Sequence, residues 1–215
     1  MKVDKSSLLL YAVTDRTWLK GRPLTEAVEE ALQAGVTFLQ LREKDLNYHS
    51  FFKLAKEIKT ISDRYNIPLV INDNVEIAMA SEADGVHVGQ KDMEAKEVRR
   101  IIGPDKILGV SVQTVEQAVE AEQNGADYLG VGAVFSTSTK LDADLVSYVT
   151  LQEICNTVSI PVVAIGGINE DNAVQLTGTG IAGIAVVSAI FAQDDITAAV
   201  KKLRQVVSRV VSYES

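Results

Sequence analysis

Cysteine is nearly absent from this sequence, because Cys155 is the only one in 215 residues. A single cysteine excludes an internal disulfide and any zinc site built from several thiolates. Cys155 lies in an apolar helical segment, which predicts a core position for it. The length of the chain is sufficient for one large hydrophobic core, so no covalent cross-link is needed for stability.

Histidine is also scarce, since only His49 and His87 occur. His49 begins a predicted helix and is expected at the surface. His87 lies inside a predicted strand and is expected to be structural. The sequence suggests no Ser–His or Cys–His pair, so nucleophilic catalysis by such a pair is not indicated.

Long hydrophobic runs are missing as well. The first apolar run, within MKVDKSSLLLYAV, is too short to span a membrane, and it ends at Thr14 and Asp15 without a small-residue cleavage pattern. The formal net charge of −8 argues against a general nucleic-acid surface. We therefore expect a cytoplasmic protein with no membrane and no nucleic-acid partner. The sequence leaves its oligomeric state open.

The chain does contain a regular alternation of short apolar runs and segments with helical spacing. Apolar, β-branched runs suit parallel strands that are buried on both faces. Strands are predicted at 8–13, 37–41, 68–71, 84–88, 107–110, 128–131, 161–165 and 181–187, and helices at 24–34, 48–65, 77–79, 95–102, 114–123, 151–158, 169–176 and 196–211. We find no linker or break in composition. The pattern predicts one domain, a (β/α)8 TIM barrel over residues 1–215, with an open doubly wound sheet as the alternative.

The stretch from 160 to 190 carries glycines and a serine just past two apolar runs. Gly166 and Gly167 end the first run, and Val187 and Ser188 close the second. Open backbone N–H groups and helix N-termini at such places bind phosphate, and the last two strands of a barrel often do so. One glycine pair alone favours a simple tight turn, but two neighbouring strand ends together favour a phosphate site.

Three polar side chains follow the second predicted strand at alternate positions, namely Gln40, Arg42 and Lys44. Alternation predicts that they project to one side, while Leu41 and Glu43 project to the other. An amide and two cations that converge at a strand end form a grip for a multiply charged anion. The alternative, a solvated strand edge, is disfavoured by the apolar residues around them.

Two carboxylates follow the next two strands. Asn72 and Asp73 end the third strand, and Asp92 stands four residues past the fourth. Hard oxygen ligands without a nearby histidine or cysteine suit Mg²⁺ that is completed by waters and substrate phosphates. Helix N-capping is the alternative for each aspartate alone. The nearby Arg42 and Lys44 make a metal site for pyrophosphate the better interpretation.

A long polar loop follows the sixth strand and contains the sequence FSTSTK at 135–140. Hydroxyl groups and Lys140 in a mobile loop can close over a phosphate. Composition alone favours this and an ordinary polar surface loop equally.

Eight short motifs in the order of the chain resemble the thiamine phosphate synthase family. They are YAVTD at 11–15, QLREK at 40–44, IND at 71–73, VHVGQKD at 86–92, GVS at 109–111, TSTK at 137–140, AIGGI at 164–168 and VVS at 186–188. Each motif is weak alone, but eight in order are specific. Two positions depart from the family pattern: Gln113 stands where histidine is frequent and Ser136 where proline is frequent. Neither removes a charge.

The resemblance implies a (β/α)8 barrel and a reaction between two small molecules. The substrates would be 4-amino-2-methyl-5-hydroxymethylpyrimidine diphosphate and a thiazole phosphate, which is carboxylated in many members. The products would be thiamine phosphate and pyrophosphate. By this resemblance the site residues fall into three groups: Gln40, Leu41, Arg42, Glu43, Lys44, Asn72, Ser111 and Lys140 for the pyrimidine diphosphate; Thr137, Ser138, Thr139, Gly166, Gly167, Val187 and Ser188 for the thiazole phosphate; and Asp73 and Asp92 for Mg²⁺.

The implied mechanism is dissociative: pyrophosphate leaves, the aminopyrimidine stabilises the methylene cation, and the thiazole nitrogen attacks. Arg42, Lys44, Lys140 and Ser111 are then the expected catalytic residues, because negative charge builds on the leaving group. A thiazole tautomerase on the same barrel is disfavoured, since the full set of cations and aspartates is present. A thiamine-phosphate-binding protein without activity stays open, and an unrelated phosphate-barrel isomerase is not suggested.

Overall fold

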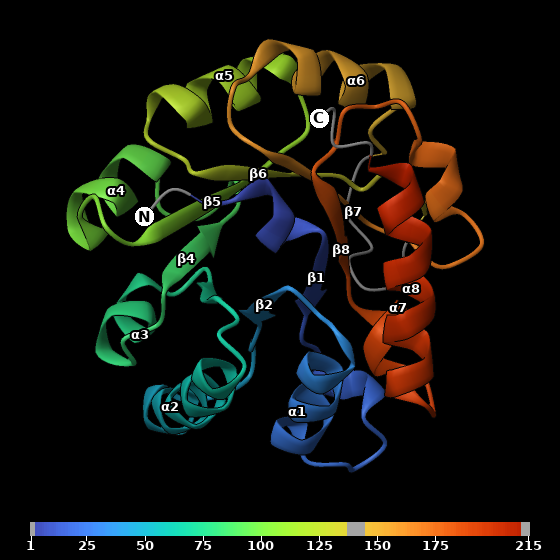
Figure 1. The fold of residues 1–215 in the computed structure, drawn as a ribbon. Coiled ribbons are helices and arrows are strands. Elements are labelled where there is room, and N and C mark those ends of the chain that lie inside the picture. The colour runs from blue at the N-terminus through green and yellow to red at the C-terminus, as the bar shows by residue number, and fades with distance from the viewer. Residues whose placement is uncertain (1–2, 137–144, 212–215) are drawn as a thin grey trace.

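A computed structural model describes residues 3–136 and 145–211. Eight parallel strands form a closed barrel in the order of the sequence, with helices around it (Figure 1). The strands are β1 (Leu10–Val13), β2 (Phe38–Leu41), β3 (Leu69–Asn72), β4 (Gly85–Val88), β5 (Ile107–Val112), β6 (Tyr128–Val131), β7 (Val162–Ile165) and β8 (Gly183–Val186). The α-helices are α1 (Leu24–Ala34), α2 (Tyr48–Arg64), α3 (Val75–Ala80), α4 (Ala95–Ile102), α5 (Val115–Gln123), α6 (Tyr148–Thr157), α7 (Ser188–Phe191) and α8 (Ile196–Val210). Three 3₁₀ segments complete the order: η1 (Lys5–Leu8), η2 (Arg16–Trp18) and η3 (Ala173–Leu176). The predicted TIM barrel is confirmed.

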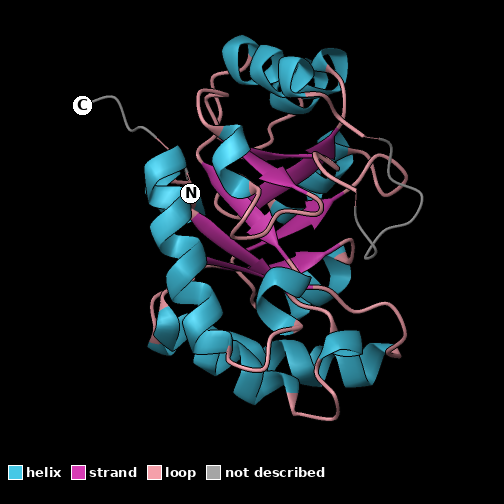
Figure 2. Ribbon diagram, turned by 90° about the vertical axis from the view of Figure 1, so that its right-hand side faces the viewer, coloured by secondary structure: helices cyan, strands magenta, loops and turns pink. Residues whose placement is uncertain are grey.

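The strands separate two hydrophobic cores. Figure 2 shows the strands surrounded by helices. Successive side chains of a strand point to opposite faces, so every strand except β4 contributes apolar side chains to both cores. The larger core lies between the sheet and the helices. The smaller core fills the barrel and consists of Leu8, Tyr11, Val13, Phe38, Val70, Ile107, Tyr128, Val163 and Ala185. Burial on both faces explains why the strands are almost uniformly apolar in sequence.

Helix boundaries follow local capping chemistry. The Thr114 side chain accepts a hydrogen bond from the Gln117 N–H, which confirms it as the N-cap of α5. Gly35 ends α1 at a φ of 121°, a backbone conformation that favours glycine. In α2, Phe51, Ala55 and Ile58 lie one turn apart and are buried against the barrel. Burying each larger side chain contributes about 1.5–3 kcal/mol to stability.

The structure corrects several predicted elements. The segment 169–176 is not an α-helix, because the Asn169 side chain accepts from the Asp171 and Asn172 N–H groups and only a 3₁₀ turn follows. Strand β5 continues through Ser111 to Val112 instead of ending at 110. The short helix α7 was missed. Cys155 is half-buried at the edge of the core rather than inside it, and burial raises the pKa of its thiol to about 12.

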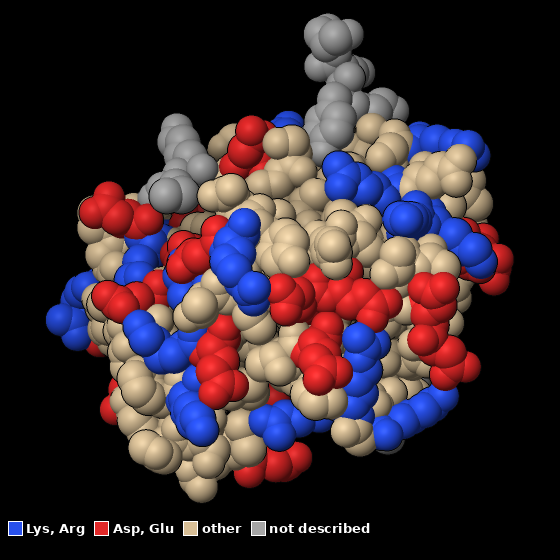
Figure 3. Space-filling model, turned by 60° about the horizontal axis from the view of Figure 1, so that its bottom comes forward, with Lys and Arg blue, Asp and Glu red and all other residues tan. Residues whose placement is uncertain are grey.

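The surface carries interspersed charges of both signs on the face that Figure 3 shows. Within residues 3–136 and 145–211, no helix is long and apolar enough to cross a membrane.

Candidate active site

Gln40, Arg42 and Lys44, at and just after the end of β2, point in three different directions and not to one side as predicted. Gln40 points into the barrel, where its Nε2 donates to the Tyr11 hydroxyl at 2.5 Å. Arg42 turns toward the loop after β1, and its Nη1 lies 3.3 Å from Asp15 Oδ2. Lys44 turns toward the loop after β3, and its Nζ lies 2.5 Å from Asp73 Oδ2. The prediction that the three converge on one side is wrong, because the strand ends at Leu41 and its alternation ends there too.

Two ion pairs tie the β1 loop to the β2 loop. Besides the pair of Arg42 with Asp15, Arg16 Nε lies 2.7 Å from Glu43 Oε1. The Arg42 N–H also donates to Thr14 Oγ1 at 2.9 Å. Burial raises the pKa of the Glu43 carboxyl, although the Arg16 guanidinium opposes the shift. Arg42 is thereby held at the barrel mouth. Only its Nη1 pairs with Asp15, so the guanidinium can still bind a further anion.

Asp73 and Asp92 form a crowded pair of carboxylates, as the sequence predicts. Partial desolvation raises the pKa of Asp92; the hydrogen bond from the Gly89 N–H lowers it, and the neighbouring Asp73 carboxyl raises it again. That hydrogen bond measures 2.7 Å at Asp92 Oδ2. Two like charges so close together favour a cation between them. Lys44 supplies one such charge from the side of Asp73.

Helix capping does not account for either aspartate. The N-cap of α3 is Asn74, whose Oδ1 accepts from the Ile77 N–H at 2.8 Å. The N-cap of α4 is Glu94, not Asp92. Asp73 also adopts a φ of 61°, which is uncommon for a residue other than glycine and is typical of functional sites. The structure thus removes the main alternative to a metal role for the pair.

A cavity of about 420 Å³ lies at these strand ends. Its lining includes four predicted site residues, listed here: Glu43, Lys44, Asn72 and Asp73. No group of three or more His, Cys, Asp or Glu side chains within the described part of the chain is arranged to hold a metal ion. A cation at Asp73 and Asp92 would therefore complete its coordination with water or with oxygen atoms of a ligand, as Mg²⁺ prefers.

The predicted thiazole-phosphate side begins at the neighbouring ends of β7 and β8. Gly166 and Gly167 have φ values of 102° and 65°, and a Cβ at Gly167 would lie 2.3 Å from the Ser136 carbonyl oxygen. Val187 precedes α7, which starts at Ser188. Barrels often bind phosphate between these two loops and the N-terminus of a short extra helix. Thr137, Ser138, Thr139 and Lys140 lie outside the described residues.

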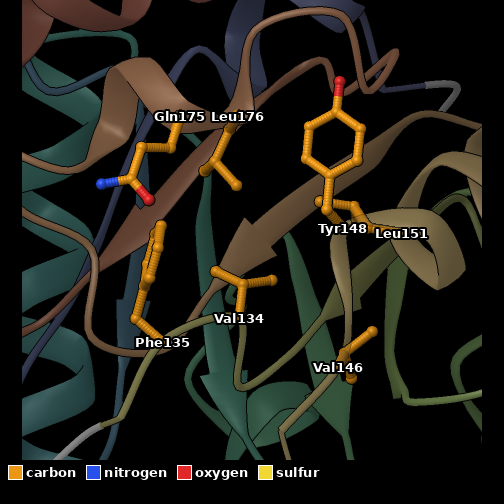
Figure 4. A pocket seen from close by; sticks show the side chains of 7 residues that line it. All are labelled: Val134, Phe135, Val146, Tyr148, Leu151, Gln175 and Leu176. Carbon is orange, nitrogen blue, oxygen red and sulfur yellow. The ribbon is translucent and has the colours of Figure 1, made fainter.

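A second, smaller pocket of about 90 Å³ lies behind this region (Figure 4). It is lined by Val134, Phe135, Val146, Tyr148, Leu151, Gln175 and Leu176. None of these residues is charged, and none was predicted as a site residue. The Tyr148 hydroxyl points away from Val134 and donates to the Thr177 carbonyl at 2.9 Å. The pocket therefore offers a phosphate no charged group.

Sequence reasoning underestimated His87. It is buried, as expected of a structural residue, but its Nε2 lies 2.8 Å from Ser111 Oγ, a predicted site residue. Its Nδ1 lies 2.8 Å from the Tyr128 hydroxyl. Burial lowers the pKa of His87 to about 4, so the imidazole is neutral near pH 7. The sequence could have indicated the contact between His87 on β4 and Ser111 on β5 only if the register of these two strands had been known. His49 is exposed, as predicted.

Comparison with known proteins gives a consistent result. The family model described as thiamine monophosphate synthase matches residues 10–190. The thiamine-phosphate synthase of Ruminiclostridium cellulolyticum is 57% identical over 94% of this chain and 97% of its own length. The enzyme of the same name from Clostridium tetani is 56% identical over 90% of this chain and 93% of its own.

A solved structure agrees with these relatives. The thiamine phosphate pyrophosphorylase from Pyrococcus furiosus superposes with a TM-score of 0.89 at 41% sequence identity, over 97% of this chain and 99% of that one. Sequence similarity along nearly the full length and agreement in three dimensions point to the same family. The chain belongs to the thiamine monophosphate synthase family.

Proposed function

We propose that this chain joins 4-amino-2-methyl-5-hydroxymethylpyrimidine diphosphate to a thiazole phosphate, giving thiamine phosphate and pyrophosphate in the cytoplasm. Family membership makes it a thiamine-phosphate synthase, a transferase that acts on small molecules. The observation that carries the proposal is the pair of Asp73 and Asp92, of which Asp73 contacts Lys44 and lines with it a cavity of about 420 Å³. Carboxylates and cations around one cavity suit a magnesium-bound diphosphate.

The two substrates divide the barrel mouth between them. The β2, β3 and β5 ends hold the pyrimidine diphosphate, and the β7 and β8 ends with the sixth loop hold the thiazole phosphate. The proposed pyrimidine-diphosphate residues are Gln40, Leu41, Arg42, Glu43, Lys44, Asn72, Ser111 and Lys140. Those for the thiazole phosphate are Thr137, Ser138, Thr139, Gly166, Gly167, Val187 and Ser188. Among them Leu41 is fully buried, so it shapes the strand end and does not contact the ligand.

Asp73 and Asp92 are the proposed ligands of Mg²⁺. The raised pKa of Asp92 supports this, because partial desolvation and then the neighbouring Asp73 carboxyl both disfavour its negative charge, which a bound cation would stabilise. When bound, the ion would supply positive charge to the leaving pyrophosphate. Lys44 already contacts Asp73, so it is positioned to bind the same phosphate oxygens as the ion.

The residues of the chain act on the leaving group and not on the carbon that reacts. Arg42 and Lys44 stabilise the negative charge that develops on pyrophosphate, with Lys140 as a further cation from the sixth loop. Ser111 holds the pyrimidine through its hydroxyl. The dissociative reaction requires no general base from the protein. His87 is neutral, buried and bonded at both nitrogens, so it is engaged in structure rather than in proton abstraction.

The direct test is a mixture of the protein with both substrates and Mg²⁺, followed by measurement of pyrophosphate. We expect one pyrophosphate for each thiamine phosphate, and none when either substrate or Mg²⁺ is omitted. Binding of thiamine phosphate without any turnover would instead identify a binding protein. Omission of the thiazole phosphate also excludes simple hydrolysis of the pyrimidine diphosphate as the source of pyrophosphate.

Gly167→Ala tests the thiazole-phosphate side. A Cβ there would overlap the Ser136 carbonyl, so the sixth loop would shift away from the β7 turn. We expect the KM for the thiazole phosphate to rise by about tenfold or more, equivalent to about 1.4 kcal/mol, with a smaller change for the pyrimidine diphosphate. Steady-state kinetics with each substrate varied in turn measures both constants.

Gly180→Ala is the matched control. Gly180 also has a positive φ, of 85°, but it precedes β8 at the opposite end of the barrel and faces Cys155. Both variants lose the backbone freedom of glycine, yet only Gly167→Ala disturbs the proposed site. An equal rise of both KM values in Gly167→Ala would show that the turn supports the barrel and not the ligand.

A further inference from the structure

A continuous chain of hydrogen bonds crosses the interior of the barrel beneath the proposed site. Gln40 Nε2 lies 2.5 Å from the Tyr11 hydroxyl, and that hydroxyl lies 2.8 Å from the Tyr128 hydroxyl. Tyr128 lies 2.8 Å from His87 Nδ1, and His87 Nε2 lies 2.8 Å from Ser111 Oγ. We call these five residues the interior chain. It connects Gln40 and Ser111, two residues proposed to bind the pyrimidine, across strands β2, β1, β6, β4 and β5.

The surroundings are built to leave room for the interior chain. A Cβ at Gly109 would lie 2.3 Å from the Tyr128 hydroxyl and 2.4 Å from His87 Nδ1, so only glycine permits this hydrogen bond. The Phe38 ring packs edge-on against both tyrosines, at centroid distances of 4.7 and 5.5 Å. Tyr128 is fully buried, Tyr11 is nearly so, and burial raises both phenol pKa values. Both hydroxyl groups therefore keep their protons.

The number of protons that each group can donate suggests the direction in which the hydrogen bonds of the interior chain run. Gln40 Nε2 can only donate, so the single proton of Tyr11 is free to point to Tyr128. We infer that Tyr11 donates to Tyr128, which leaves the single proton of Tyr128 for His87 Nδ1 and places the imidazole proton on Nε2. That proton is donated to Ser111 Oγ. The proton of Ser111 is then left to point away from the chain.

The two ends of the chain consequently differ in what they offer to a ligand. Gln40 uses its amide nitrogen within the barrel. The only fully buried polar side-chain atom without a partner, among the residues that the structure describes, is Ser81 Oγ. The Gln40 oxygen, to which no described residue donates, is therefore accessible as an acceptor. Ser111 offers a donor.

We propose that Tyr128 is a positioning residue, whose hydroxyl orders the interior chain so that Gln40 presents an acceptor and Ser111 a donor to the pyrimidine. The inference rests on the proposed function, because an aminopyrimidine has the complementary pattern of an amino donor beside a ring-nitrogen acceptor. Tyr128 acts only through Tyr11 and His87. It lies below the ligand and touches no reacting atom.

The first measurement needs no activity and no change to the interior chain. Nitrogen-15 NMR of the ligand-free protein reports which imidazole nitrogen carries the proton, and His49→Gln leaves His87 as the only histidine. We expect a neutral His87 with its proton on Nε2. A proton on Nδ1 alone would reverse the direction of the interior chain, and protons on both nitrogens would make His87 a donor to Tyr128 as well as to Ser111. Either result would overturn the proposal. This outcome is independent of whether the protein makes thiamine phosphate.

The second measurement uses Tyr128→Phe, which removes one oxygen and keeps the ring. We expect the two His87 tautomers to become mixed and the KM for the pyrimidine diphosphate to rise about tenfold. The KM for the thiazole phosphate and kcat should stay within twofold. Phe38→Leu is the control, since it alters packing against both tyrosines without a polar change. It should keep the Nε2 tautomer and the ratio of the two KM values.

Either of two results would contradict the role of Tyr128. One is an unchanged tautomer and pyrimidine KM in Tyr128→Phe. The other is an equal rise of that KM in Phe38→Leu, which would assign the effect to packing. If Tyr128→Phe does not fold, the spectrum of His87 in the His49→Gln protein still decides the direction of the chain. Normal thiamine phosphate synthesis by a protein whose His87 carries its proton on Nδ1 would refute the role of Tyr128 and leave the proposed function intact.

Discussion

Asp73→Asn and Asp92→Asn should each lower kcat by about 100- to 1,000-fold, a magnitude typical for the loss of one group that stabilises transition-state charge. Asparagine has nearly the same shape as aspartate but lacks the charge that holds Mg²⁺. Asp73 lines the cavity beside Lys44, Asp92 neighbours Asp73, and neither aspartate caps a helix. Steady-state kinetics over a range of Mg²⁺ concentrations would show the loss and a weaker dependence on the metal.

Stability should respond to Asp92→Asn in the opposite direction. The folded-state pKa of Asp92 is raised, so its ionisation costs stability as pH rises through that pKa. Removing this charge should therefore leave the metal-free protein at pH 7 as stable as the unmodified protein or slightly more stable. Added Mg²⁺ should raise the Tm of the unmodified protein, less so at a pH below the pKa of Asp92, and not that of the variant.

Asp194→Asn is a suitable control for both aspartate variants. Asp194 pairs with Lys20 in an exposed ion pair outside the cavity, so its loss should leave kcat and the effect of Mg²⁺ unchanged. Full activity of Asp73→Asn or Asp92→Asn in the presence of EDTA would refute the metal assignment. A lower Tm of metal-free Asp92→Asn would mean that the carboxylate serves the fold.

Arg42→Ala should lower kcat by about a hundredfold or more, while the pyrimidine diphosphate still binds. The Arg42 guanidinium pairs with Asp15, and the backbone N–H of Arg42 donates a hydrogen bond to Thr14 Oγ1. A positioned cation contributes most when negative charge develops on the leaving group, so its loss affects kcat more than KM. Single-turnover kinetics, with binding measured separately, distinguishes the two effects.

Two variants make this prediction specific. Arg42→Lys keeps the charge but not the planar fork, so it should recover only part of the activity. Arg16→Ala removes the neighbouring cation, which pairs with Glu43 and not with Asp15. Its kcat should fall much less than that of Arg42→Ala, because the Arg16 charge is already paired with the largely buried Glu43 carboxylate. A large loss of affinity for the pyrimidine diphosphate in Arg42→Ala, with an unchanged chemical step, would assign Arg42 to binding alone.

The sequence by itself determined the barrel and most of its elements. Helices α1 and α4 and strand β6 begin and end where the pattern predicts. The apolar spacing of these elements, Gly35 at the end of α1 and the Thr114 cap of α5 are local signals. Such signals depend only on residues close in sequence, so they can be recognised from the sequence alone. The positions of Asp73 and Asp92 after the third and fourth predicted strands also placed them together, since the ends of neighbouring parallel strands meet at one edge.

Only the tertiary structure decided how the side chains at the strand ends are oriented. Arg42 and Lys44 share a strand end in sequence but turn to opposite neighbours, because Asp15 and Asp73 attract them from different loops. The segment 169–176 formed a 3₁₀ turn, since side-chain bonds from Asn169 competed with the helix. Local spacing carries no information about such competition.

The interior chain was the feature least visible in the sequence. Tyr11 and Tyr128 are separated by 117 positions, and each alone is an ordinary apolar strand residue. Closure of the barrel brings their hydroxyl groups to 2.8 Å, and Gly109 gives Tyr128 room to reach His87. The sequence fixes which residues lie on each strand, but only the register of a closed barrel decides which of them meet inside it.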